Sequence, residues 1–302
     1  SWSLIAPLGP MAELRRSAWV GLLAGLGWLT KLTGVLAVPA VVGAYGIEGL
    51  RRRQLGAATR SCVIVALVSG VVGGWFYARN LVHYGYLYPY DLPVHAEMHL
   101  QEPGERSVLD YVYVPLSTFT DSVSLGPDLL HSVWGGTYVT LWYDGHRHFL
   151  PPKGPRVQQL GTAVLLLALL PSLAFLIGVG SGIRRAVSTS GAPDLPLLLL
   201  AGFTLAGYVL FTWRNPWFST VKGTYLLGAM LPFAFYASET LARWTAGRGV
   251  RRAATWTALV AAPLRRLSLT HQNARPRPSG METSARMRPT KISSRPAASV
   301  AS

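Results

Sequence analysis

Residues 61–79 read SCVIVALVSGVVGGWFYAR and carry no charged side chain before Arg79. A helix rises 1.5 Å per residue, so about 20 apolar residues cross the roughly 30 Å hydrocarbon layer of a membrane. Only a helix satisfies its own backbone hydrogen bonds there. Three more stretches of this kind follow at 157–179, 195–213 and 223–241, and only the last contains a charged residue, Glu239. The sequence therefore predicts four membrane-spanning helices.

The composition of the whole chain agrees with a membrane protein. Of its 302 residues 50% are hydrophobic and 14% are charged, against about 25% charged in ordinary globular proteins. The single cysteine, Cys62, excludes an internal disulfide and a cysteine-based metal site. The formal charge of +15 is uneven, because residues 240–302 carry 12 Lys/Arg and one acidic residue. The membrane part is thus only weakly basic.

A further apolar stretch, residues 18–48, is too long for one comfortable span and has Lys31 near its middle. A lysine at the bilayer centre is costly, whereas a lysine at a hairpin tip reaches the surface. We therefore expect two short helices that meet at Lys31, which makes about six membrane helices in all. One long tilted helix is the alternative. The predicted class is an all-α polytopic membrane protein with one long extracytoplasmic loop that contains short interfacial elements.

The basic residues outside the spans set the expected orientation. With a hairpin at Lys31, arginine clusters near residues 15–16, 51–60, 184–185 and 243–252 all fall on one side. Cytoplasmic loops carry such an excess of Lys and Arg. The prediction is an integral protein of the bacterial cytoplasmic (inner) membrane, with residues 80–156 extracytoplasmic. The expected parts are N-terminal helices (1–79), this loop (80–156), C-terminal helices (157–245) and a basic tail (246–302).

The loop at 80–156 is where chemistry is expected, because loops of this length are usually functional. Residues 80–155 hold eight of the 13 acidic residues and six of the seven histidines, together with many aromatic rings. Rings beside carboxylates suit either a membrane-interface belt or a sugar-binding platform. Asp91, Trp142 and Asp144 are the candidate substrate-binding residues of this loop. The alternation of TYVTLWYD at 137–144 suits a helix or a strand.

A metal site in this loop is a weaker prediction. His95 and His99 in HAEMH stand at helical spacing, but Glu does not directly follow the first histidine as it does in zinc proteases. No metal ligand is therefore assigned. A divalent cation held by loop carboxylates is the more plausible cofactor, because such ions prefer oxygen ligands and bridge phosphates.

Four cations are expected on the outer side, where positive residues are uncommon. Lys31 lies at the hairpin tip, Arg79 ends a span, and Arg214 and Lys222 flank the short connection between two spans. Each suits a helix end whose charge reaches the headgroups. Together they suit the recognition of an anionic headgroup, since lysine and arginine are the usual partners of phosphate.

Three segments carry a resemblance to a known family. They are GLLAGLGWLTKLTGVLAVPA at 21–40, GGWFYARNLVHYGYLYPYDL at 73–92 and KGTYLLGAMLPFAF at 222–235. In this order, and separated by a long outer loop, they resemble integral-membrane glycosyltransferases of the C-type fold. These are the bacterial family 39 relatives that include aminoarabinose and protein mannosyltransferases.

The resemblance implies a hexosyl- or pentosyltransferase that passes a sugar from a polyprenyl-phosphate donor to a glycan, lipid or protein acceptor at the outer face. Lys31 matches the end of a short helix in the family, Arg79 an Arg-Asn pair after a span, and Lys222 with Tyr225 a basic, tyrosine-containing segment. Thr224 and Gly228 stand where many relatives have arginine and proline. The implied substrate-binding residues are thus Lys31, Arg79, Arg214, Lys222 and Tyr225.

The catalytic base is not assigned by the resemblance. In the family an acidic residue of the first outer loop acts as the base, and this chain is expected to be a fragment that begins beyond that loop. If the chain is whole, the candidates are Asp91, Glu97, Asp144 and His146. An upstream coding sequence would contain the missing loop.

The basic tail and two other functions complete the predictions. The tail from residue 271 is rich in Arg, Pro and Ser, has almost no large apolar side chains and has no interleaved aromatic residue. No nucleic acid is therefore expected, and anionic lipid is the expected contact. A transporter or flippase of lipid-linked or anionic substrates is one alternative function. A non-catalytic membrane subunit that binds a partner through the loop is the other.

Overall fold

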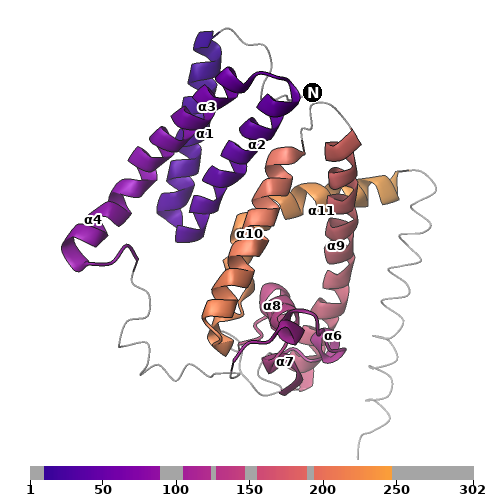
Figure 1. Cartoon of the computed structure of the whole chain (residues 1–302). Helices are drawn as coiled ribbons and strands as arrows, with labels where there is room; N and C mark the ends of the chain where they lie inside the picture. The colour runs from indigo at the N-terminus through magenta and orange to yellow at the C-terminus, as the bar shows by residue number, and fades with distance from the viewer. Residues whose placement is uncertain (1–9, 89–104, 124–126, 147–154, 189–193, 247–302) are drawn as a thin grey trace, which may run out of the picture. The chain divides into compact units, whose positions relative to one another are not determined.

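The computed structural model describes residues 10–88, 105–123, 127–146, 155–188 and 194–246. All regular secondary structure in these ranges is helical (Figure 1), which confirms the all-α prediction. The segment TYVTLWYD at 137–144, whose sequence suited either a helix or a strand, lies mostly within the helix α8 (Val133–Trp142). The chain divides into two units, Ser1–Val260 and Ala261–Ser302, and every described residue belongs to the first.

Four helical stretches are long and apolar enough to cross a membrane: Leu32–Arg51, Leu55–Tyr84, Arg156–Ser188 and Leu195–Arg214. The last three contain the predicted spans at 61–79, 157–179 and 195–213. The predicted span at 223–241 differs, because it begins as the 3₁₀ helix η5 (Gly223–Ala229) and continues as α11 (Met230–Thr245), an α-helix of 16 residues. The backbone of η5 is tied to α8, where the N–H of Gly223 donates to the hydroxyl of Thr140.

The chain breaks at Lys31, as predicted. The helix α1 (Pro10–Thr30) ends one residue before Lys31, and the 3₁₀ helix η1 (Leu32–Leu36) leads into α2 (Ala37–Arg51). The first half of this hairpin is longer than predicted, since α1 has 21 residues and begins well before residue 18. Its charged first turn is held in the fold because the hydroxyl of Ser61 donates to Glu13 over 3.0 Å.

The N-terminal helices alternate in direction. The helix α3 (Leu55–Ser69), a π-helical turn η2 (Gly70–Gly74) and α4 (Trp75–Tyr84) form one continuous rod. This rod runs parallel to α1, because Ser61 meets Glu13 near the start and Tyr77 stacks on Trp28 near the end. It runs antiparallel to α2, where the thiol of Cys62 donates to the carbonyl of Val42.

The C-terminal helices pack on this group through α2. The helix α10 (Leu195–Arg214) runs antiparallel to α2. Its Leu199 lies against Gly43, and its Gly207 lies against Leu36. The long helix α9 (Pro155–Ser188) is crossed by α11 (Figure 1), with Phe175 near Phe233 and Arg185 paired with Glu239 further along.

Short elements cover the start of α9 and the end of α10. The hydroxyl of Tyr143 donates to the carbonyl of Val157, and the hydroxyl of Thr162 donates to the carbonyl of Thr120. Five short helical elements, including α8, make up this region: η3 (Val108–Tyr111), α6 (Ser117–Thr120), α7 (Pro127–Leu130), α8 and η4 (Phe218–Thr220).

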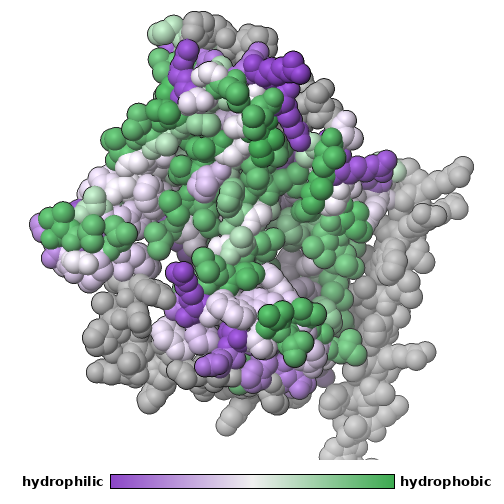
Figure 2. All heavy atoms as spheres, in the orientation of Figure 1, coloured by the Kyte–Doolittle hydropathy of each residue, from purple (hydrophilic) through white to green (hydrophobic). Residues whose placement is uncertain are grey.

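These contacts define two ends of the helical unit, with hydrophobic side chains covering much of the helices between them in Figure 2. Ala44 of α2 packs with Ala186 of α9 and Leu195 of α10 at the first end. We call it the basic end, since the described arginines that were expected to share one side lie there: Arg15, Arg16, Arg51, Arg52, Arg53, Arg60, Arg184, Arg185 and Arg243. The other three of that group, Arg248, Arg251 and Arg252, lie outside the described residues. The other end, which carries Lys31, Lys222 and the short elements, is the lysine end.

Candidate functional site

A tight turn places Lys31 at the lysine end. The backbone N–H of Lys31 donates to the carbonyl of Gly27, and the N–H of Gly34 donates to the carbonyl of Lys31. A Cβ atom at Gly34 would collide with the carbonyl of Gly27, so the turn requires glycine at position 34. The backbone of Lys31 itself is extended, with φ −158° and ψ 139°.

The ammonium of Lys31 reaches a distant part of the chain. It donates to the carbonyl oxygen of Thr224 over 2.7 Å and lies 5.2 Å from the ring centroid of Tyr225, in cation–π geometry. Burial lowers the pKa of Lys31 below its ordinary value. An ammonium has three donors, and within the described residues the carbonyl of Thr224 is the only hydrogen-bond partner of the Lys31 ammonium. The pairing of Lys31 with Tyr225 joins two of the predicted site residues.

Lys222 lies directly before η5, three residues from Tyr225. Its neighbour Gly223 packs so closely on the backbone of Leu141 that a Cβ atom there would collide with it, and this contact fixes the start of η5 on α8. Burial lowers the pKa of Lys222, as it does for Lys31. Within the described ranges neither lysine forms an ion pair with a carboxylate. Two half-buried cations without a counter-charge favour the binding of an anion.

Aromatic side chains surround these lysines. The ring of Tyr225 packs on Phe211 of α10 with centroids 4.8 Å apart. Burial raises the pKa of Tyr225, and the nearby Tyr88 raises it further. The hydroxyl of Tyr77 donates to the carbonyl of Trp28 in α1, close to Lys31 in the chain. Rings from four separate segments thus line the region around Lys31, which we call, with Lys222 and Tyr225, the lysine site.

The other predicted cations are not brought into this site by any described contact. Arg79 is exposed on α4, and its guanidinium lies 5.9 Å from the ring of Tyr84. Arg214 is exposed at the end of α10. Both residues lie at the lysine end, so their roles in binding stay predictions.

The predicted loop residues have different environments. Trp142 ends α8 and packs on Phe233, so its ring is part of the helix packing. Asp144 follows α8 and, with burial as the larger cause, contributes to a raised pKa of Tyr143. Asp91 and the HAEMH segment with Glu97 lie outside the described residues. Among the residues that the structure describes, no group of three or more His, Cys, Asp or Glu side chains is placed to hold a metal ion.

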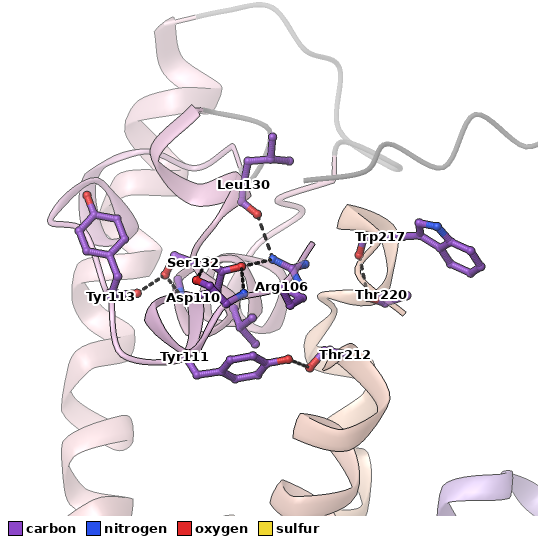
Figure 3. A network of polar contacts seen from close by, with 12 residues as sticks. Arg106, Asp110, Tyr111, Tyr113, Leu130, Ser132, Thr212, Trp217 and Thr220 are labelled. Atoms are coloured by element: carbon purple, nitrogen blue, oxygen red, sulfur yellow. Dashed lines mark hydrogen bonds and ion pairs between the residues drawn. The ribbon is translucent and has the colours of Figure 1, made fainter. Parts of the chain in front are cut away.

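Arg106 is the residue that the sequence analysis missed. Its side chain is 1% exposed and lies 3.5 Å from the carboxylate of Asp110 (Figure 3). Its Nη1 atom also donates to the carbonyl of Leu130 over 3.3 Å, whereas Nε and Nη2 have no partner among the described residues. The sequence signal that could have indicated this ion pair is the spacing of Arg106 and Asp110, which are four residues apart. This pair fixes the loop at the lysine end.

The chain matches no protein-family model, no curated protein and no solved structure. The interpretation of the site therefore depends on its own chemistry. That chemistry is two unneutralised lysines and several aromatic rings at one end of a set of apolar helices. Such a site can bind an anionic group and pack against the apolar faces of a ligand.

Proposed function

We propose that the protein is a membrane glycosyltransferase, or part of one, that uses a polyprenyl-phosphate sugar as donor at the outer face of the cytoplasmic membrane. The observation that carries the proposal is the lysine site, where Lys31 and Lys222 stand half-buried without a carboxylate partner in the described residues. A lipid-linked phosphate is an anion that arrives from the bilayer. The site lies at the ends of helices apolar enough to reach through that bilayer.

The chemistry assigned to the lysines is stabilisation of the leaving group. In the transfer, a bond forms between the acceptor oxygen and C1 of the sugar, and the bond between C1 and the phosphate oxygen breaks. The electron pair leaves with the polyprenyl phosphate, and the proton of the acceptor hydroxyl passes to a base. Ammonium groups at the phosphate stabilise the charge that develops there. The aromatic rings around Tyr225 are assigned to the sugar and the first part of the lipid.

The proposed orientation follows from the two ends. Cytoplasmic loops are rich in arginine and lysine, so the basic end is assigned to the cytoplasm and the lysine end to the outer side. The test uses single cysteines in a Cys62→Ser background, with one at Asp128 and one at Arg53. A membrane-impermeant maleimide added to intact cells is expected to label position 128 and not position 53. The reverse labelling would overturn the orientation.

The test of the activity is sugar transfer in membranes that contain the protein. Radiolabelled hexoses and pentoses on polyprenyl phosphate are the donors, and transfer to membrane acceptors is measured. Losing one charge-assisted hydrogen bond costs about 1.5–3 kcal/mol, so Lys222→Ala is expected to lower transfer by about tenfold or more. Lys222→Arg is expected to retain part of it, and Arg60→Ala at the basic end is the control.

Two results would contradict the proposal. Unaltered transfer in the Lys31→Ala/Lys222→Ala double variant would remove the lysines from the donor site. Movement of the lipid-linked sugar across the membrane without transfer would instead indicate a transporter. Expression and detergent-extracted yield must match the wild type for either result to count.

A further inference from the structure

The segment 108–116 at the lysine end carries a dense group of exposed apolar side chains. It reads VLDYVYVPL and includes η3. Leu109 is 72% exposed and Leu116 is 84% exposed. The six large apolar residues of the segment that are exposed are Val108, Leu109, Val112, Tyr113, Val114 and Leu116. So many exposed apolar residues in one short segment are typical of an interaction surface.

The one charged group of the same segment and two of its backbone carbonyls face inward. The carboxylate of Asp110 lies beside the buried Arg106, and the hydroxyl of Ser107 donates to it over 3.0 Å (Figure 3). The indole N–H of Trp134 donates to the carbonyl of Tyr111, and the hydroxyl of Ser132 donates to the carbonyl of Tyr113. The outward face is thus free of charge, although the segment contains an aspartate. This polarity is the reverse of that of a surface that faces water.

The segment is continuous with the exposed apolar surface of α10. The hydroxyl of Tyr111 and that of Thr212 lie 2.9 Å apart, and the ring of Tyr111 is 5.9 Å from that of Trp213. Leu210 and Trp213 are themselves about half exposed on this candidate span, at 52% and 46%. Tyr and Trp near the end of a span belong to the headgroup region of a bilayer. The segment 108–116 therefore stands where the hydrocarbon layer ends.

We propose that residues 108–116 form an interfacial docking segment, whose apolar side chains lie in the boundary between the acyl chains and the headgroups of the bilayer that α10 enters. The buried ion pair of Arg106 and Asp110 fixes its backbone, and the inward hydrogen bonds keep the Asp110 carboxylate and the carbonyls of Tyr111 and Tyr113 away from the lipid. Short segments with one polar and one apolar face bind membranes in this way. The inference does not depend on the glycosyltransferase proposal.

The test measures what surrounds the segment in a bilayer. Nitroxide labels are placed on Leu109→Cys, Val112→Cys and Leu116→Cys in the Cys62→Ser protein, which is reconstituted in phosphatidylcholine nanodiscs. Collision with oxygen, which is enriched in lipid, is compared with collision with a water-soluble nickel chelate. Leu176→Cys on the exposed face of α9 is the lipid control, and Glu105→Cys, three residues before the segment, is the water control.

We expect the ratio of oxygen to nickel collisions at positions 109, 112 and 116 to exceed that at 105 several-fold and to lie below that at 176, which is deeper in the hydrocarbon layer. Nickel collisions as frequent as those at position 105 would overturn the proposal. Protection from both reagents would also overturn it, because a protein surface would then cover the segment. A second measurement needs no substitution, namely cross-linking of the unmodified protein to a phosphatidylcholine with a diazirine on its acyl chain. Adducts in residues 108–116 are expected, and their absence while α10 is labelled would contradict the docking.

Discussion

The cations described at the two ends of the helical unit have different partners. At the basic end Arg185 binds both Asp194 and Glu239, with N–O distances of 2.7 and 3.0 Å, and Arg52 binds Glu48 at 2.6 Å. At the lysine end Lys31 donates to a backbone carbonyl and faces a ring, and Lys222 has no carboxylate partner in the described residues. Arg106, paired with Asp110, is the exception at that end.

The cations at the basic end stabilise the fold through ion pairs, whereas the two lysines at the lysine end are available to bind an anion. The carboxylate of Asp194 is 3% exposed, and its hydrogen bonds from Arg185 hold its pKa below the ordinary value. Its charge is therefore used within the protein and connects α9, α10 and α11. The lysines instead have pKa values lowered by burial, which means that their charged forms are destabilised until an anion arrives. The first arrangement supplies stability and the second supplies a binding site.

The largest expected effect is the loss of the Arg185 network. Arg185→Ala leaves the buried carboxylate of Asp194 without its partner. Breaking a fully buried pair costs about 3 kcal/mol of unfolding free energy, and the cost here is expected to be somewhat smaller because Arg185 is 36% exposed. Thermal unfolding of the purified protein in detergent measures the change as a fall in Tm. The neighbouring arginine is exposed, so Arg184→Ala is the matched control and should leave the Tm nearly unchanged. Equal effects of the two substitutions would remove the distinction between the ends.

The same network makes a prediction about pH. The pKa of Asp194 is lowered on folding, so its contribution to stability is present above the unfolded pKa, near 3.8, and is lost as the pH falls through the lower folded value. The difference in Tm between wild type and Asp194→Asn should therefore be constant near neutral pH and shrink only in strong acid. A difference that disappears between pH 6 and 7 would require another titrating group.

A substitution in the Lys31 turn tests how the fold positions the site. Gly34→Ala places a methyl group against the carbonyl of Gly27, and such overpacking costs about 1–3 kcal/mol. We expect a lower Tm together with weaker binding of polyprenyl phosphate, because the turn that orients Lys31 is displaced. Gly27→Ala is the control, since a Cβ atom there meets nothing within 4 Å. Unchanged binding in Gly34→Ala would show that the turn does not set the site.

The binding of phosphate should itself depend on pH. Because burial lowers the pKa values of Lys31 and Lys222, their ammonium groups are lost at a lower pH than the ordinary lysine value of 10.5. The affinity for polyprenyl phosphate is expected to fall as the pH rises through these lowered values. Titration of binding between pH 7 and 10.5 measures this fall. A constant affinity over that range would contradict a role for the charged lysines.

Arg79→Ala is expected to have the smallest effect. The side chain is exposed and its described contact is the ring of Tyr84, a cation–π pair worth about 0.5–1 kcal/mol at an exposed site. Binding of polyprenyl phosphate should change by less than about fivefold. A loss as large as that of Lys222→Ala would place Arg79 in the binding site, as the family resemblance implies.

The sequence predicted the fold because its signals there are local. Uninterrupted apolar runs, such as residues 61–79, require a helix whatever surrounds them. The break at Lys31 was also predictable, from the cost of a lysine at the bilayer centre. The span predicted at 223–241 is helical but is not among the four candidate spans, and hydropathy did not report that Gly223 is hydrogen bonded to Thr140 and opens a 3₁₀ helix.

The candidate site was predictable only in part. Lys31, Lys222 and Tyr225 were proposed together, but only the structure shows that Lys31 reaches Thr224 across 193 positions of sequence. Arg106 was missed because a cation inside a polar loop looks like any solvated residue until its burial is known. The inward orientation of Asp110 likewise depends on tertiary contacts with Arg106 and Ser107.

Direct binding of polyprenyl phosphate tests the difference between the two ends most sharply. The ligand is titrated in nanodiscs onto two double variants of equal charge change, Lys31→Met/Lys222→Met at the lysine end and Arg51→Met/Arg60→Met at the basic end. We predict that the first pair weakens binding on the order of 100-fold, from two lost charge-assisted hydrogen bonds, and that the second pair leaves it unchanged. Equal binding by the two double variants would contradict the lysine site as the place where this protein holds an anion.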